Sequence, residues 1–151
     1  MGVQEGRMTE PFEAATGDGP MAPPDAGREA AVRTAFEGLL HIRRVMDVSG
    51  PARWERLQPV RAIALALEAA GIEPSAVDAD GKRYATGYRV SAAEGATGVR
   101  VEWLGPPGSG AEYAANESLR RCAAVLRPLG WVALEYRGPR RHHYLEVEPA
   151  G

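Results

Sequence analysis

The spacing of apolar residues changes along this chain, and that change constrains the fold more than any other feature. Before residue 71, apolar side chains recur every three or four positions, which is typical of amphipathic helices. From residue 88 they alternate with polar side chains, which is typical of strands with one buried face. We therefore predict a single α+β domain over residues 26–151, in which two N-terminal helices precede a ββαββ unit of antiparallel hairpins.

The two N-terminal helices are expected over residues 28–46 and 52–70. The first has its apolar residues on one side, and the second contains AIALAL, which is apolar nearly all round and predicts a buried helix. Pro59 must kink the second helix or start its second half. Residues 1–25 are rich in acidic residues, glycine and proline, so we expect a disordered tail.

The strands are expected at residues 88–92, 99–103, 131–136 and 143–147, and alternation assigns their faces. One face, packed on helices, would hold Val90, Val99, Val101, Trp103, Val132, Leu134, Tyr136, Leu145 and Val147. The opposite face would hold Arg89, Arg100, Trp131, His142 and Tyr144, interspersed with Glu102, Glu135, Glu146 and Glu148. The turn between the last two strands adds Arg137, Arg140 and Arg141 to that opposite face.

A glycine-rich stretch, WLGPPGSGAEY, has the glycine spacing of a phosphate-binding loop at Gly105 and Gly110. Ala111 stands where such a loop needs lysine, and Glu112 stands where it needs a magnesium-binding hydroxyl. A capping box explains the stretch better, with Ser109 and Glu112 each accepting from the other's amide at a helix start. We therefore predict no nucleotide site here, and no cofactor.

Other candidates for chemistry have simpler interpretations. His142 and His143 are adjacent in a strand and point to opposite faces, so they cannot share a metal ion without distortion. Cys122, the only cysteine, falls on the apolar stripe of a helix and is expected to be a core residue rather than a nucleophile. Asp78 and Asp80 fit a plain turn, because the later ligands of a calcium loop are absent. We expect no metal site and no enzyme.

Charge and composition limit the partners. The chain has a formal net charge of −2, and 17 of its 18 basic residues are arginine, a bias typical of high-GC genomes. No stretch approaches the length of a membrane span, and the N-terminus lacks a secretory pattern, so a cytoplasmic protein is expected.

The face that carries arginine and aromatic residues is the strongest functional signal. Tryptophan, tyrosine and arginine are enriched where proteins bind one another, and they also form platforms for single-stranded nucleic acid. Glutamates on the same face oppose phosphate contact. We therefore predict a non-enzymatic binding or adaptor protein that engages a protein partner or a second copy of itself. A small DNA- or RNA-binding regulator that uses the same residues stays open as the alternative.

Overall fold

The computed structural model describes residues 12–22, 26–93 and 98–150. Within these residues, three helices precede the strands: α2 (Ala26–Val45), α3 (Arg53–Leu57) and α4 (Pro59–Ala69). Two short strands, β1 (Ala76–Val77) and β2 (Arg83–Ala85), form a separate hairpin around the turn at Asp80-Gly81. The remainder is β3 (Gly87–Ala92), β4 (Val99–Leu104), α5 (Ala111–Leu126), η1 (Arg127–Leu129), β5 (Trp131–Arg137), η2 (Pro139–Arg141) and β6 (His143–Pro149). The predicted α+β fold, with N-terminal helices before a ββαββ unit, is confirmed.

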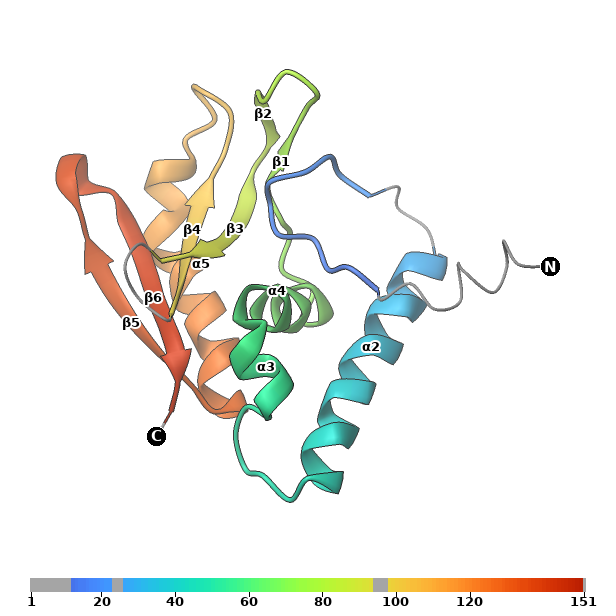
Figure 1. Ribbon diagram of the computed structural model, residues 1–151. Coiled ribbons are helices and arrows are strands. Elements are labelled where there is room, and N and C mark those ends of the chain that lie inside the picture. Colours follow the sequence, from blue (N-terminus) through green and yellow to red (C-terminus); the bar gives the residue numbers. More distant parts are fainter. Residues whose placement is uncertain (1–11, 23–25, 94–97, 151) are drawn as a thin grey trace.

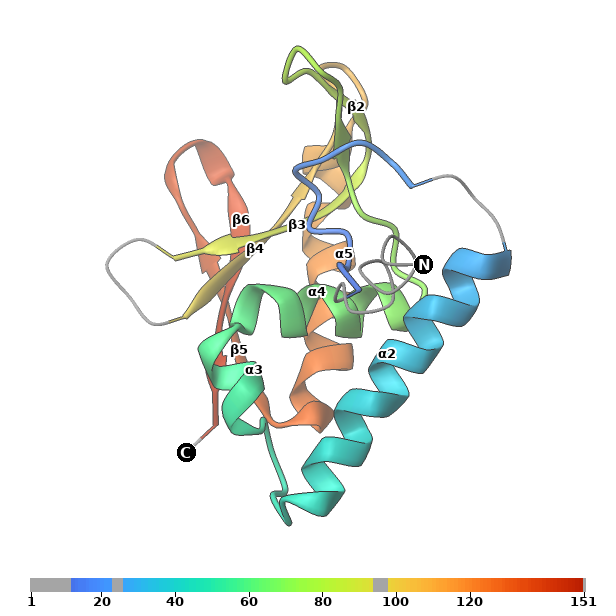
Figure 2. The ribbon, with the colours of Figure 1, turned by 45° about the vertical axis from the view of Figure 1, so that its right-hand side comes forward.

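The four long strands form one antiparallel sheet in the order β3–β4–β6–β5. Helix α5 crosses one face of this sheet and packs on β4, β5 and β6, while α4 packs on β3 (Figure 1). Helix α2 lies further out and packs on α4 (Figure 2). The core is therefore a layer between helices and sheet, with Ile63 and Leu67 of α4, Leu119 and Leu126 of α5, and Val101 of β4 among its buried side chains.

Proline sets the boundary between the second and third helices. The chain from 53 to 69 turns at Gln58, and Pro59 occupies the first position of α4, where its missing amide hydrogen costs nothing. Residues 62–67 are then buried on every side, as their composition predicted. The tight placement of α4 between α2 and the sheet follows from this lack of a polar face.

The predicted capping box at Ser109 and Glu112 is wrong. Helix α5 begins at Ala111, one residue after Gly110, which adopts a left-handed conformation with φ of 78°. The Ser109 hydroxyl accepts a hydrogen bond from the amide of Ala111 at 3.3 Å rather than from Glu112. The cap residue, Gly110, has a positive φ that glycine adopts without strain, and it has no side chain to accept from the first amides of the helix.

Residues 12–22 lie within the stretch that composition suggested as a tail, and the structure gives them defined contacts along β3. The carbonyl of Thr16 accepts from the amide of Val90, and the hydroxyl of Tyr88 donates to the carbonyl of Ala15 at 2.9 Å. Gly17 is left-handed, with φ of 94°, and a Cβ there would collide with the Tyr88 carbonyl. The segment therefore covers the free edge of β3, together with the chain at residues 73–75.

Candidate functional site

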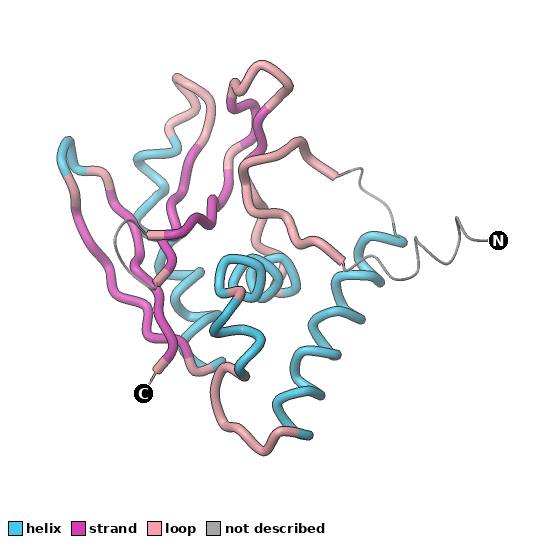
Figure 3. The backbone as a smooth tube through the Cα atoms, viewed as in Figure 1, coloured by secondary structure: helices cyan, strands magenta, loops and turns pink. Residues whose placement is uncertain are grey.

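The sheet has an inner face, toward α4 and α5, and an outer face on the opposite side. Among the described residues, no helix packs on the outer face, whose strands run side by side in Figure 3. Residues that lie opposite one another on neighbouring strands share a face, so the register arranges the outer-face side chains in three rows across the strands. The outer face carries Arg89, Ser91, Arg100, Glu102, Val132, Leu134, Tyr136, Tyr144, Glu146 and Glu148.

The face assignment predicted for β5 is wrong. Trp131 is 3% exposed and lies on the inner face with Ala133, whereas Leu134 and Tyr136 are 49% and 41% exposed on the outer face. Register with β6 decides this, since Ala133 pairs with Val147 and Glu135 pairs with Leu145, both of which belong to the inner side. Glu135 therefore lies on the helix side as well, where Arg120 of α5 approaches it at 3.7 Å.

A stack of one guanidinium group and two rings crosses the outer face. The guanidinium carbon of Arg100 lies 4.0 Å from the ring centre of Tyr144, and the rings of Tyr144 and Tyr136 are stacked with centres 5.7 Å apart and planes 12° apart. The buried Nε of Arg100 has no hydrogen-bond partner among the described residues, and its Nη2 lies 3.7 Å from Glu146. Leu134 stands beside this stack, so the surface combines flat, apolar and polar groups.

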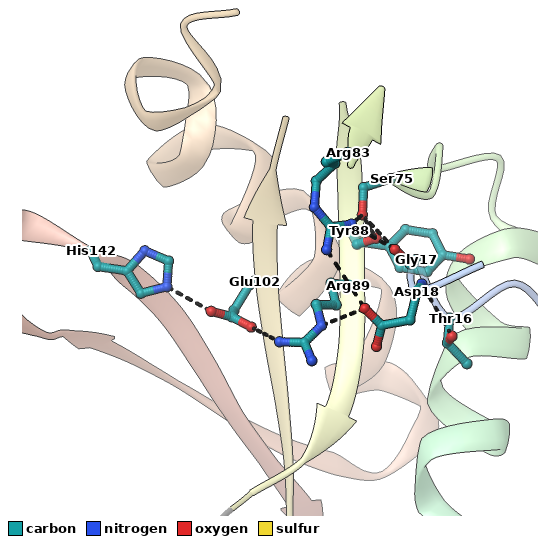
Figure 4. A network of polar contacts seen from close by, with 9 residues as sticks. All are labelled: Thr16, Gly17, Asp18, Ser75, Arg83, Tyr88, Arg89, Glu102 and His142. Carbon is teal, nitrogen blue, oxygen red and sulfur yellow. Dashed lines mark hydrogen bonds and ion pairs between the residues drawn. The ribbon is translucent and has the colours of Figure 1, made fainter. Parts of the chain in front are cut away.

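Alternating charges join the outer face to residues 12–22 (Figure 4). His142 Nε2 lies 2.7 Å from one oxygen of Glu102, and the other oxygen accepts from Arg89 at 3.0 Å. Arg89 Nε also donates to Asp18 at 2.7 Å, and Arg83 approaches the same carboxylate. Burial by itself lowers the pKa of Arg89, but the hydrogen bonds and charges of Asp18 and Glu102 outweigh it and raise that pKa. The charges of Arg89 and Glu102 are thus largely satisfied within the molecule.

The hairpin between β5 and β6 carries the remaining predicted arginines. Arg137 and Arg140 are exposed, and neither has an ion pair among the described side chains. Arg140 is left-handed, with φ of 58°, which turns the chain through η2 toward β6. The side chain of Arg141 lies outside the described part of the structure. Of the predicted site residues, Arg89, Arg100, His142 and Tyr144 therefore meet on the outer face. Arg137 pairs with His143 and lies on the helix side with Glu135, Arg140 borders a cavity at the start of α5, and Trp131 is buried on the inner face.

A cavity of about 340 Å³ lies beneath the hairpin turn, between the start of α5 and the end of β4. Its lining includes Trp103, Glu112, Arg140 and His143, and the buried indole nitrogen of Trp103 has no hydrogen-bond partner among the described residues. The described residues that line it include no cysteine, serine or threonine. Cys122 lies elsewhere, fully buried in the core, where burial raises the pKa of its thiol to about 12. A protonated thiol in the core cannot act as a nucleophile at neutral pH.

A second cavity, about 670 Å³, lies between residues 13–22 and helices α2 and α4. Its polar side chains serve the fold: Glu68 accepts from Arg28 at 2.8 Å and from the amide of Ala15 at 2.9 Å. These bonds hold the N-terminal segment against the helices. We therefore place the candidate site on the outer face rather than in this cavity.

Exposed apolar side chains also gather where α2 ends and α3 begins. They are Ile42, Val45, Met46, Val48, Trp54 and Leu57. Large exposed apolar side chains in one region of a fold often mark contact surfaces. This corner therefore competes with the outer face as a place for association.

Searches against known proteins give no relative for this chain: no family model, curated protein or solved structure matches it. Over residues 12–22, 26–93 and 98–150, no group of three or more histidine, cysteine or acidic side chains could hold a metal ion. Within the same residues no helix is long and apolar enough to cross a membrane.

Three outer-face residues, Val132, Leu134 and Tyr136, were assigned to the inner face because they are the large apolar residues at alternate positions of this strand. A signal in the sequence was the equal spacing of Tyr136 and Tyr144, four residues on either side of Arg140 in the turn, which makes the two tyrosines cross-strand neighbours. The contacts of Asp18 with Arg83 and Arg89 have no local signal, since these residues lie far apart in the sequence.

Proposed function

We propose that this chain is a non-enzymatic binding protein, active in the cytoplasm, whose outer sheet face contacts a protein partner. The observation that supports this most is the stack of Arg100, Tyr144 and Tyr136 beside exposed Leu134, on a face that no described helix covers. Tyrosine rings have few rotatable bonds and Arg100 is already stacked on Tyr144, so these groups give contact area at low entropic cost.

The charges on this face favour protein over nucleic acid. Arg89 is held between Asp18 and Glu102, and Arg100 lies between Tyr144 and Glu146. Arginines already matched by carboxylates offer little attraction to phosphate, and phosphate contact supplies most of the affinity in non-specific nucleic-acid binding. A protein surface, by contrast, can use the rings and Leu134 directly.

Affinity capture from an extract of the source cells, read by quantitative mass spectrometry, tests the proposal. Arg100→Ala removes the guanidinium of the stack and Leu134→Ser removes the exposed apolar group, so each is expected to reduce the captured partner by at least about tenfold relative to wild type. Arg44→Ala is the matched control, because it removes an exposed arginine on α2, away from the sheet. Equal capture by all four proteins would reject the outer face as the binding surface.

A nucleic-acid-binding function is the second candidate, and the hairpin turn is the observation that favours it. Arg137 and Arg140 are exposed without ion-pair partners among the described side chains, and Arg141 follows them in sequence. Fluorescence anisotropy of labelled single-stranded and duplex oligonucleotides, at low and physiological salt, tests it. Binding that weakens steeply with salt and is lost in the Arg137→Ala/Arg140→Ala/Arg141→Ala triple variant would favour this function and count against a protein partner.

A further inference from the structure

One edge of the sheet is covered and the other is open. Residues 15–17 and 73–75 lie along β3 and hydrogen-bond to its backbone. Strand β5 stands at the other edge, and no described strand pairs with its far side (Figure 1). Open edges promote pairing with another chain, and proteins usually block them with charge, proline or cover.

Three hydrogen bonds show which backbone groups of β5 face outward. The amide of Gly138 donates to the carbonyl of His142, and the amide of Ala150 donates to the carbonyl of Gly130. The backbone N–H and C=O groups of even-numbered residues in this strand therefore point toward β6. The carbonyl of Ala133 instead accepts from Arg127 at 2.8 Å. Since the groups of an antiparallel strand alternate, the N–H and C=O of Glu135 and Arg137 point away from the sheet.

We propose that a second copy of this chain pairs with this edge, β5 against β5 in antiparallel orientation, about a twofold axis at Tyr136. In this register Glu135 of each copy lies opposite Arg137 of the other, so each of the two pairs joins opposite charges and exchanges two backbone hydrogen bonds. A twofold axis at Glu135 would instead place the Glu135 side chains of the two copies opposite each other, which is repulsive. Charge complementarity therefore selects the register.

The surrounding side chains fit the same register. Tyr136 faces Tyr136 of the second copy on the outer face, which extends the stack of Arg100, Tyr144 and Tyr136 across the axis. Leu134 lies opposite Gly138, which has no side chain of its own and is flanked by the ring of Tyr144. Pairing stops one step further, at Ala133 and Pro139, because Pro139 has no amide hydrogen and Arg127 already satisfies the Ala133 carbonyl. The ends of the interface are thus defined by the sequence.

This arrangement rests on the proposed function, because the second copy is itself a protein partner. The two sheets would join into one continuous sheet, with the outer faces of both copies on the same side. Its test does not depend on any other partner. Sedimentation velocity of the full chain, from about 10 µM to about 1 mM, measures self-association in the range where small interfaces respond. Wild type is expected to form a dimer, and a monomer over the whole range would overturn the proposal.

Charge exchange tests the register. Glu135→Arg and Arg137→Glu each place like charges in both pairs, so each is expected to weaken the dimer by at least about tenfold. Mixing these two variants restores opposite charges at both pairs, and a heterodimer is expected to form. Single variants that dimerise as wild type does, or a mixture that stays monomeric, would overturn the proposal and shift attention to the exposed corner of α2 and α3.

A cross-link gives an independent measurement. Tyr136→Cys places two thiols opposite each other at a position without hydrogen bonds, where strand partners approach closely enough for a disulfide. Oxidation is expected to give a covalent dimer, whereas Val132→Cys, on the same face but four residues from the axis, gives none. Buried Cys122 adds no background. A dimer that Tyr136→Cys cannot trap would count against the register.

The two proposals fail in distinguishable ways. A monomeric wild type with partner capture that still depends on Arg100 would reject the dimer alone. A dimer with the expected charge behaviour, joined to capture that ignores Arg100→Ala and Leu134→Ser, would reject the outer face as a partner surface and leave the β5 edge as the contact.

Discussion

Two aromatic side chains of one strand show how much a residue's face matters here. Trp131 is buried on the inner face against the helices, whereas Tyr136, five positions later, is exposed on the outer face. Trp131→Ala is expected to lower the free energy of unfolding by about 3–5 kcal/mol, because it leaves a cavity in the core. Tyr136→Ala is expected to cost about 1 kcal/mol or less, since it loses only a ring stack and a half-exposed contact. Urea unfolding of both variants measures the difference, and equal losses would contradict the face assignment.

The buried thiol of Cys122 is expected to make the free energy of unfolding depend on pH in the alkaline range. Burial raises its pKa to about 12, so the folded protein keeps the proton that the unfolded chain releases near pH 9. The unfolded state then binds fewer protons, and the free energy of unfolding falls as pH rises, by about 1–2 kcal/mol from pH 7 to pH 10. Burial also raises the pKa of Tyr88, which adds to the loss above pH 10.

Cys122→Ala is the matched variant for this effect. It is expected to be less stable at pH 7 because it opens a small cavity, but its stability should fall less between pH 7 and pH 10. Urea unfolding of the variant and of wild type at pH 7 and pH 10 measures how much the free energy of unfolding of each protein falls. An equal decline in the variant and in wild type would show that another group causes the alkaline loss.

The inner-face residues of β3, β4 and β6 could be predicted from alternation, and those of β5 could not. Val90, Val101 and Leu145 are buried as the pattern predicted. In WVALEYR the apolar residues occupy both parities, so composition favoured Val132, Leu134 and Tyr136 for the core. The turn at Gly138–His142 sets the register, and a shift of one residue moves every side chain to the other face.

At the scale of elements, a buried ion pair connects α2, α3 and the short helix η1. Arg43 of α2 makes two hydrogen bonds to Glu55 of α3 and donates to the carbonyl of Leu129 at 2.7 Å. Glu55 also accepts from the amide of Ala52 at 2.9 Å, where α3 begins. Nothing in the sequence marks this pair, because both residues read as ordinary surface charges of helices. The contact depends on the direction of the α2–α3 turn, which the pattern does not define.

Removing one partner of this pair is expected to be costly. Glu55→Ala leaves the Arg43 guanidinium buried and unpaired, and should lower the free energy of unfolding by about 3–5 kcal/mol. The double variant Arg43→Leu/Glu55→Leu should lose less than Glu55→Ala alone, because no unpaired charge remains. Arg61→Ala breaks an exposed pair with Glu13 and should cost under about 1 kcal/mol. Thermal and urea unfolding of the set measure these losses, and a mild Glu55→Ala would contradict the buried pair.

At the scale of the whole molecule, α2, α4 and α5 lie on the inner side of the sheet or beyond it, and no described helix covers the outer face. The order of helices and strands predicted this fold, because the apolar spacing changes with each element. It did not predict which face stays open, since that depends on how α2, α4 and α5 pack. The proposed function depends on that open face, and so it is the central claim to test.

Photo-cross-linking in the source cells tests this claim most directly. A photoreactive benzoylphenylalanine in place of Leu134 lies on the outer face, and the same residue in place of Tyr113 lies on α5, where Tyr113 is 87% exposed on the other side of the sheet. Illumination is expected to give a discrete protein adduct from position 134 and none from position 113. Adducts from position 113 alone, or the same adducts from both, would contradict the outer face as the surface through which this protein binds.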